Sequence, residues 1–122
     1  MTSLSKDRKK ATIVVGDDIS SPKYYLFDLE KGRMTFLFNM WPEIEEPNLA
    51  KTKPIKFTAS DGITIHGYFT NARNVKDGEK PPLVVLPHGG PIGPRDNWDF
   101  DPDVHILSNA GYAVLKVNFR GS

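Results

Sequence analysis

The first third of the chain consists of short segments in which β-branched and aromatic residues cluster between polar turns. Residues 12–16 form a β-branched run, and residues 23–28 and 33–38 carry the aromatic side chains of this region. Residues 28–32 form a glycine-containing connection of the length found in hairpins. The pattern predicts three antiparallel strands within residues 11–40, and a sheet this small would keep two open edges.

The segments on either side of these strands lack such a pattern. Residues 1–10 include Lys6, Arg8, Lys9 and Lys10, which is typical of a disordered or merely basic N-terminus. Residues 41–53 contain two prolines and three glutamates without any periodicity. This composition predicts a linker that ends before Pro54.

An alternation of apolar and polar residues begins at Pro54 and predicts a second β-structure. Ile55 and Phe57 alternate with polar residues, Ser60-Asp61-Gly62 is a turn signal, and the alternation resumes from Ile63 to Phe69. This arrangement predicts a β-hairpin with one apolar face. The polar residues 71–82 then predict an exposed loop.

A strand, a loop, a helix and a second strand are predicted after residue 82. Leu83–Leu86 and Ala113–Val117 are apolar runs typical of buried strands, and the first should be covered on both faces. Between them, Asp101 is suited to cap a helix that starts at Pro102 and ends near Gly111. The helix would direct three side chains toward the sheet, those of Val104, Leu107 and Ala110.

This order of elements predicts the α/β class. A βαβ unit joins parallel strands by a right-handed crossover. An antiparallel hairpin followed by a βαβ unit corresponds to the N-terminal part of an α/β-hydrolase sheet. Such a unit leaves a sheet edge and both faces open, so we expect it to continue into further units or to pair with another polypeptide. Self-association through the exposed sheet edge is one form of such pairing.

Composition excludes several classes of function. Lys and Arg number 16 against 15 Asp and Glu, a net charge of +1, so no field attracts nucleic acid. The chain has no cysteine, and its three histidines lie far apart without metal-ligand spacing, so we expect no metal and no cofactor. No apolar run approaches the roughly 20 residues that cross a bilayer. We expect a soluble, cytoplasmic protein without membrane contact.

The motif His88-Gly89-Gly90 directly follows the predicted strand Leu83–Leu86. Adjacent glycines allow a sharp turn and a close approach of backbone to ligand, and amides exposed there can donate to a developing oxyanion. α/β-hydrolases carry a His-Gly-Gly-type motif in the loop after the third strand. The motif predicts that the Gly90 N–H forms part of an oxyanion hole, and the alternative is a loop without chemistry.

The chain offers no nucleophile for acyl transfer. No serine stands in a G-x-S-x-G elbow: Ser108 is predicted within a helix, Ser60 in a turn, and Ser122 is the last residue. His88 is a second candidate for chemistry, as a general base. In α/β-hydrolases the catalytic histidine follows the nucleophile and the acid, so we expect His88 to order the loop instead. The roles of three neighbouring side chains stay open, those of Arg95, Asp96 and Trp98.

Residues 82–122 resemble the start of the peptidase domain in the prolyl oligopeptidase family, closest to its acylaminoacyl-peptidase and dipeptidyl-aminopeptidase-like branch. The resemblance rests on Pro82-Leu83-Val84-Val85-Leu86-Pro87-His88-Gly89-Gly90-Pro91, on Arg95-Asp96-x-Trp98-x-Phe100-Asp101, and on Gly111–Leu115 with Val117–Ser122. Phe57–Gly62 with Ile65–Tyr68 is similar to the family's entry hairpin. Residues 11–40 resemble a last β-propeller blade, with Tyr24–Asp28 as its inner motif.

The resemblance implies a complete protein in which a propeller gates an α/β-hydrolase with a Ser-Asp-His triad, which hydrolyses short peptides by acyl transfer. Of the family's functional residues only the oxyanion-loop amide carries over, onto Gly90, with Gly89 and His88 shaping the loop. We expect residues 54–122 to be the first portion of the peptidase domain, truncated before the nucleophile and inactive alone. A carboxylesterase of the same fold and a non-catalytic interaction domain are the alternatives.

Overall fold

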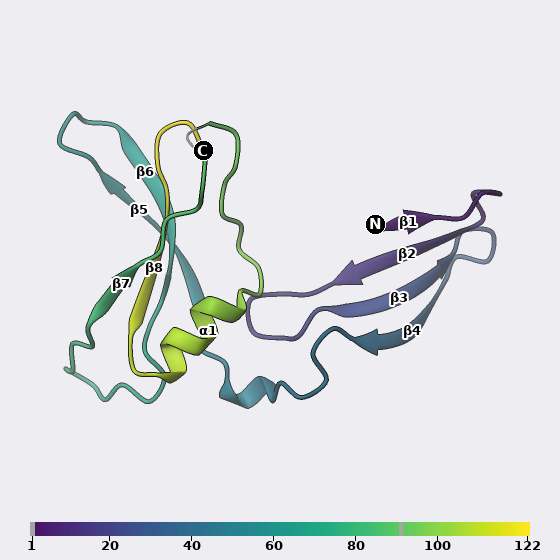
Figure 1. The fold of residues 1–122 in the computed structure, drawn as a ribbon, viewed down its shortest axis with the longest axis horizontal. Helices are drawn as coiled ribbons and strands as arrows, with labels where there is room; N and C mark the ends of the chain where they lie inside the picture. The colour runs from purple at the N-terminus through teal and green to yellow at the C-terminus, as the bar shows by residue number, and fades with distance from the viewer. Residues whose placement is uncertain (1, 91) are drawn as a thin grey trace.

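The computed structural model describes residues 2–90 and 92–122, and within them it contains two four-stranded sheets and one α-helix. Figure 1 shows the two sheets on either side of the molecule, with the helix and a long connection between them. Met1 and Pro91, which belong to the predicted basic terminus and the predicted glycine loop, lie outside the described residues.

The first sheet is antiparallel throughout. Its order is β1-β2-β3-β4, formed by Ser3–Leu4, Lys10–Val15, Lys23–Asp28 and Arg33–Asn39. The three strands predicted within residues 11–40 are present. β1 is an additional strand in the segment expected to be disordered or merely basic, and its pairing with β2 places Ser3 opposite Thr12 and Leu4 opposite Ala11. Backbone pairing therefore orders part of a segment whose side chains gave no strand signal.

Much of the first sheet is open to solvent. In β4 the side chains of Phe36 and Phe38 are 52% and 53% exposed. Each contacts one aromatic ring of β3, Phe36 edge-on against Tyr25 and Phe38 stacked on Tyr24. The two pairs involve consecutive residues of β3, and about half of each phenylalanine stays exposed, so the sheet keeps exposed apolar surface.

The second sheet combines the predicted hairpin with the predicted βαβ unit. Its order is β5-β6-β8-β7, formed by Thr52–Thr58, Thr64–Thr70, Ala113–Asn118 and Leu83–Val85. β5 and β6 are antiparallel, β6 and β8 are antiparallel, and β7 runs parallel to β8. Helix α1, Pro102–Asn109, connects β7 to β8. β5 begins at Thr52 and so includes the last two residues of the predicted linker.

The core lies between α1 and one face of the second sheet. Val114, Thr70 and Ser108 are at most 1% exposed, and Val104 is 3% exposed. The prediction that Ala110 faces the sheet is wrong, because Ala110 is exposed. An α-helix has about 3.6 residues per turn. Residues four apart therefore stay on one face, whereas two successive steps of three, from Val104 to Leu107 to Ala110, move progressively off it. Val104 and Ser108 therefore share the buried face and Ala110 has rotated away from it.

The opposite face of the second sheet is partly exposed. The prediction that β7 is covered on both faces is wrong: Leu83 and Val85 are 53% and 55% exposed. Phe57 of β5, whose alternation places it on the same face, is 44% exposed. α1 covers the face that carries Val114, whereas the other face is only partly covered, since Ala113 and Ile65 on it are buried.

The two sheets are joined through the loop that contains Asp18. The Asp18 carboxylate accepts from the Thr52 backbone N–H at 2.7 Å, and the Asp18 carbonyl oxygen lies 2.8 Å from His105 Nε2 of α1. Trp41 packs against Phe100, which packs in turn against His105. A 3₁₀ helix, η1, spans Glu46–Asn48 of the predicted linker. The connection is thus anchored at several points. No helix in the described part of the chain has the length and apolarity to span a membrane.

Candidate functional site

The glycine loop, residues 87–94, leaves the sheet after the C-terminal end of β7. The Leu86 N–H donates to the Leu115 carbonyl at 2.9 Å, which extends the parallel pairing by one residue and fixes where the loop begins. Further along, the Gly93 N–H donates to the Gly121 carbonyl at 2.8 Å. Both ends of the loop are therefore tied to β8 and to the residues that follow it.

Gly90 has a backbone conformation that requires glycine. Its φ is +78°, and a Cβ at this position would lie 3.1 Å from Pro94 Cγ. Gly89 has open space where a Cβ would be. Among residues 2–90 and 92–122, neither the Gly89 nor the Gly90 amide donates to an acceptor. Both backbone donors thus lack a partner in the described part of the chain.

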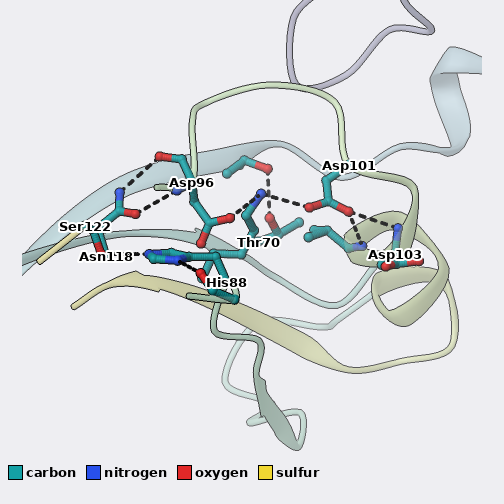
Figure 2. Close-up of polar contacts among 11 residues, drawn as sticks. Thr70, His88, Asp96, Asp101, Asp103, Asn118 and Ser122 are labelled. Carbon is teal, nitrogen blue, oxygen red and sulfur yellow. Dashed lines mark hydrogen bonds and ion pairs between the residues drawn. The ribbon is translucent and has the colours of Figure 1, made fainter. Parts of the chain in front are cut away.

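His88 is held by three contacts. Its Nδ1 lies 3.0 Å from the Gly89 carbonyl oxygen, and its Nε2 lies 2.7 Å from the Ser122 hydroxyl oxygen. Its ring stacks on Phe119 with centroids 4.3 Å apart. Figure 2 shows His88 and Ser122 side by side at the end of the sheet. No carboxylate of the described residues hydrogen-bonds to His88.

A buried lysine lies beneath the same connection. The Lys116 residue of β8 is 7% exposed, and its Nζ lies 2.8 Å from Asp101 Oδ2 and 3.3 Å from Asp96 Oδ1. Burial alone would lower the pKa of Lys116, but the hydrogen bonds and charges of Asp101 and Asp96 raise it. Burial would likewise raise the pKa of Asp101, but Lys116 and two backbone donors lower it. Both groups are therefore charged at neutral pH.

Asp96 and Asp101 fix the loop and the helix to β8. The Asp96 N–H donates to Asn118 Oδ1 at 2.8 Å, and Asn118 Nδ2 donates back to the Asp96 carbonyl at 3.1 Å (Figure 2). Asp101 caps α1 as predicted, since its carboxylate accepts from the N–H groups of Asp103 and Val104. This cluster of Asp96, Asp101, Lys116 and Asn118 holds the second half of the connection between β7 and α1 rigidly.

The other candidate residues stay outside these contacts. Trp98 is 54% exposed, and Arg95 forms no ion pair within the described residues. His66 is exposed on β6, and His105 is buried at the junction of the two sheets. No set of three or more potential metal ligands comes together in the part of the chain that the structure describes.

One cavity lies beside the glycine loop and a second lies away from it. One of about 240 Å³ adjoins the glycine loop and is lined in part by Ile65, His66, Arg95, Asn118, Phe119 and Ser122. A larger one of about 540 Å³ lies between η1 and α1 and is lined in part by Trp41, Leu49, Arg73, Phe100 and His105. Gly89 and Gly90 line neither cavity. The larger one has no lining residue from the glycine loop or from the residues that contact it.

Sequence reasoning missed two residues of this site. Lys116 was predicted only as one position of a buried strand, although a lysine in such a strand signals that carboxylates lie nearby. Ser122 was considered only as a nucleophile and set aside. Its hydrogen bond to His88 joins residues 34 positions apart, and no sequence pattern marks such a contact.

Comparisons of sequence point to peptidases. No protein-family model matches the chain. Dipeptidyl aminopeptidase BIII of Pseudoxanthomonas mexicana is 39% identical over 105 residues, which cover 81% of this chain and 15% of that protein. Dipeptidyl peptidase family member 6 of Caenorhabditis elegans is 32% identical over 118 residues, covering 80% of this chain and 16% of that protein. The chain thus spans about one sixth of the length of these relatives.

Comparisons of structure also point to peptidases. A puromycin-hydrolysing peptidase of Mycobacterium tuberculosis has a TM-score of 0.71 at 25% identity, over 90% of this chain and 18% of that one. The acylaminoacyl peptidase of Pyrococcus horikoshii has a TM-score of 0.65 at 26% identity, over 93% of this chain and 18% of that one. All four proteins are named as peptidases, so neither a carboxylesterase nor a non-catalytic domain is favoured.

Proposed function

Because this chain belongs to the prolyl oligopeptidase family of serine peptidases, we propose that it supplies the oxyanion-hole loop of an enzyme that hydrolyses short peptides by acyl transfer. In this proposal the Gly90 N–H donates to the oxygen of the reacting carbonyl, while Gly89 and His88 shape the loop. The nucleophile, acid and base of the triad lie outside residues 1–122. The chain alone is then inactive.

The observation that carries this proposal is the conformation of Gly90. It stands at the C-terminal end of a parallel strand, its φ is +78°, and its amide has no acceptor among the described residues. In α/β-hydrolases the loop after the third strand contributes one oxyanion donor, and the residue after the nucleophile contributes the other. β7 is the third strand counted from Pro54, which agrees with that position.

The proposed role of the Gly90 N–H is to stabilise the negative charge that develops on the carbonyl oxygen during the reaction. When a nucleophile attacks the scissile carbonyl, the carbonyl oxygen becomes an oxyanion, and a fixed N–H stabilises that charge more than it stabilises the neutral substrate. One such donor is worth about 2.7–4 kcal/mol in comparable hydrolases. The donor must already be in place, and the Lys116 cluster and the pairing of Gly93 with Gly121 provide that rigidity.

The proposed organisation of the chain follows the same family. Residues 11–40 form part of a propeller-like blade, residues 41–53 form the linker, apart from Thr52 and Lys53 at the start of β5, and residues 54–122 form the first portion of an α/β-hydrolase domain. The likeness to complete peptidases over 90% and 93% of the chain supports this division. The substrate proposed for the complete protein is a short peptide, in keeping with the aminopeptidase names of the relatives.

Assays of the isolated chain test the proposal that residues 1–122 lack a catalytic nucleophile. The chain is incubated with peptide and ester substrates and with a fluorophosphonate that labels activated serines. We expect no turnover and no labelling, because the described structure holds no Ser-His pair oriented by a carboxylate. Labelling of Ser122, or turnover that the substitution Ser122→Ala abolishes, would contradict the proposal.

A further inference from the structure

The peptide between Gly89 and Gly90 has a defined direction. The Gly89 carbonyl oxygen lies 3.0 Å from His88 Nδ1. In a planar trans peptide the carbonyl and the following N–H point in opposite directions. The contact with His88 therefore directs the Gly90 N–H away from the imidazole ring. Without this contact, a peptide flanked by two glycines is free to rotate.

The direction of this peptide depends on which ring nitrogen of His88 carries the proton. A carbonyl oxygen only accepts, so Nδ1 must be the donor to Gly89. In a neutral imidazole Nε2 is then an acceptor, and its partner at 2.7 Å must donate. That partner is the Ser122 hydroxyl. The opposite tautomer would set the Nδ1 lone pair against the Gly89 oxygen and would turn the peptide.

The turn after β8 presents Ser122 to His88. The Ser122 N–H donates to the Phe119 carbonyl at 3.0 Å, which brings the hydroxyl beside the ring that stacks on His88. Phe119 and Ser122 together hold the His88 ring in place. The Gly89 carbonyl selects the Nδ1–H tautomer, because the Ser122 hydroxyl can donate or accept. The residues Phe119–Ser122 therefore act as one unit on the glycine loop.

We propose that Ser122 is a positioning residue of the oxyanion loop: it holds the His88 ring where Nδ1 can donate to the Gly89 carbonyl, and so acts on the direction of the Gly90 N–H. The catalytic purpose of this direction rests on the proposed peptidase function, whereas the direction itself does not. Ser122 is thereby assigned a role other than that of nucleophile.

Nuclear magnetic resonance of the full chain, labelled with ¹⁵N, tests this inference. Long-range ¹H–¹⁵N spectra distinguish the protonated from the unprotonated ring nitrogen of His88. We expect the Nδ1–H tautomer to predominate in the wild type. In Ser122→Ala the His88 ring is no longer held at Nε2 and loses its bond to the Gly89 carbonyl. The ratio of the Nδ1–H to the Nε2–H tautomer should therefore fall by roughly fivefold, the factor that one ordinary hydrogen bond provides. The resonance of the Gly90 amide should shift in the same variant.

Matched variants separate positioning from a general loss of structure. Ser122→Thr keeps the hydroxyl and should restore the wild-type tautomer ratio. Ser60→Ala, in the exposed turn between β5 and β6, should leave both the ratio and the Gly90 resonance unchanged. A wild-type His88 protonated mainly on Nε2, or an unchanged ratio in folded Ser122→Ala, would overturn the inference. Because no substrate is involved, this outcome is independent of whether the peptidase function fails.

Discussion

At the scale of single residues, burial and their contact with each other set the pKa values of Lys116 and Asp101. A lysine at 7% exposure would favour its neutral form, yet two carboxylates within 3.3 Å keep it charged. Removing either partner from such a pair leaves a poorly solvated charge, which costs more than losing an exposed pair. The cluster is therefore a point at which a small change loosens both the loop and the start of α1.

The pH dependence of stability tests the pairing of Asp101 with Lys116. The pKa of Asp101 is lowered in the folded chain, so its contribution is present above its ordinary value of 3.8 and is lost as pH falls through the folded pKa. Asp101→Asn keeps a good helix cap but removes the charge. We expect it to cost about 1–3 kcal/mol at neutral pH, where the lost bond is to a charged group.

Chemical denaturation at a series of pH values measures this effect. The difference in unfolding free energy between wild type and Asp101→Asn should be constant near neutral pH and should shrink below pH 3.8. Taking the difference removes the contributions of other carboxylates, which titrate in both proteins. A difference that grows toward acid pH would contradict the assigned pairing.

At the scale of elements, local signals predicted the order of structure but not what each face contacts. The hairpin of β5 and β6 follows from alternation, and α1 follows from the cap at Asp101 and from Gly111, whose φ is +95°. β1 had no signal of its own, because its two residues are ordered by pairing with β2. The exposure of β7 and of Ala110 depends on what lies opposite each element, which is set by tertiary packing.

For the candidate site, too, the sequence predicted local features but not the contacts between distant residues. The glycines were predicted, because their conformational freedom is a property of the residue itself. The contacts of His88 with Ser122 and of Asp96 with Asn118 join the loop after β7 to the end of β8. Such contacts arise only once the two strands are parallel neighbours, so one sequence without its fold does not reveal them.

The pairing of β6 with β8 makes a prediction at Gly67. A Cβ at Gly67 would lie 2.5 Å from the Lys116 carbonyl oxygen, a backbone atom that cannot move without displacing β8. We expect Gly67→Ala to destabilise the chain by about 1–3 kcal/mol, as overpacking does. Gly16→Ala is the control, because its nearest neighbour would be at an ordinary 3.4 Å. Equal unfolding free energies for the two variants, measured by denaturation, would refute the close approach.

At the scale of the whole molecule, both sheets keep apolar surface without cover. Phe36 and Phe38 on the first sheet and Leu83 and Val85 on the second are each about half exposed. Contiguous apolar surface of this kind favours association. The second sheet also ends in β7, whose outer edge has no partner strand among the described residues.

Sedimentation of the chain tests this association. We expect the sedimentation coefficient to rise with concentration, because chains pair through the edge and open face of β7. The double substitution of Leu83→Lys with Val85→Lys places charge on that face and should give a monomer. Ile92→Lys, at a side chain 80% exposed in the glycine loop, adds charge elsewhere and should not. A wild-type chain that stays monomeric at all concentrations would contradict this expectation.

The Gly90 amide is tested most directly in an active enzyme. Residues of this chain are grafted in place of the matching 105-residue segment of dipeptidyl aminopeptidase BIII, and kcat and KM are measured for Gly90→Ala and Gly78→Ala. Both glycines have positive φ, +78° and +85°, so both substitutions strain the local backbone. Gly78 lies in an exposed loop with open space for a Cβ, whereas a Cβ at Gly90 would also lie 3.1 Å from Pro94 Cγ. Alanine keeps its own N–H, but the strained backbone moves that donor away from the reacting oxygen. We predict an active graft in which Gly90→Ala lowers kcat by as much as about 10²–10³ with little change in KM, while Gly78→Ala has no such effect. Equal kcat values in the two variants would contradict the role of the Gly90 amide.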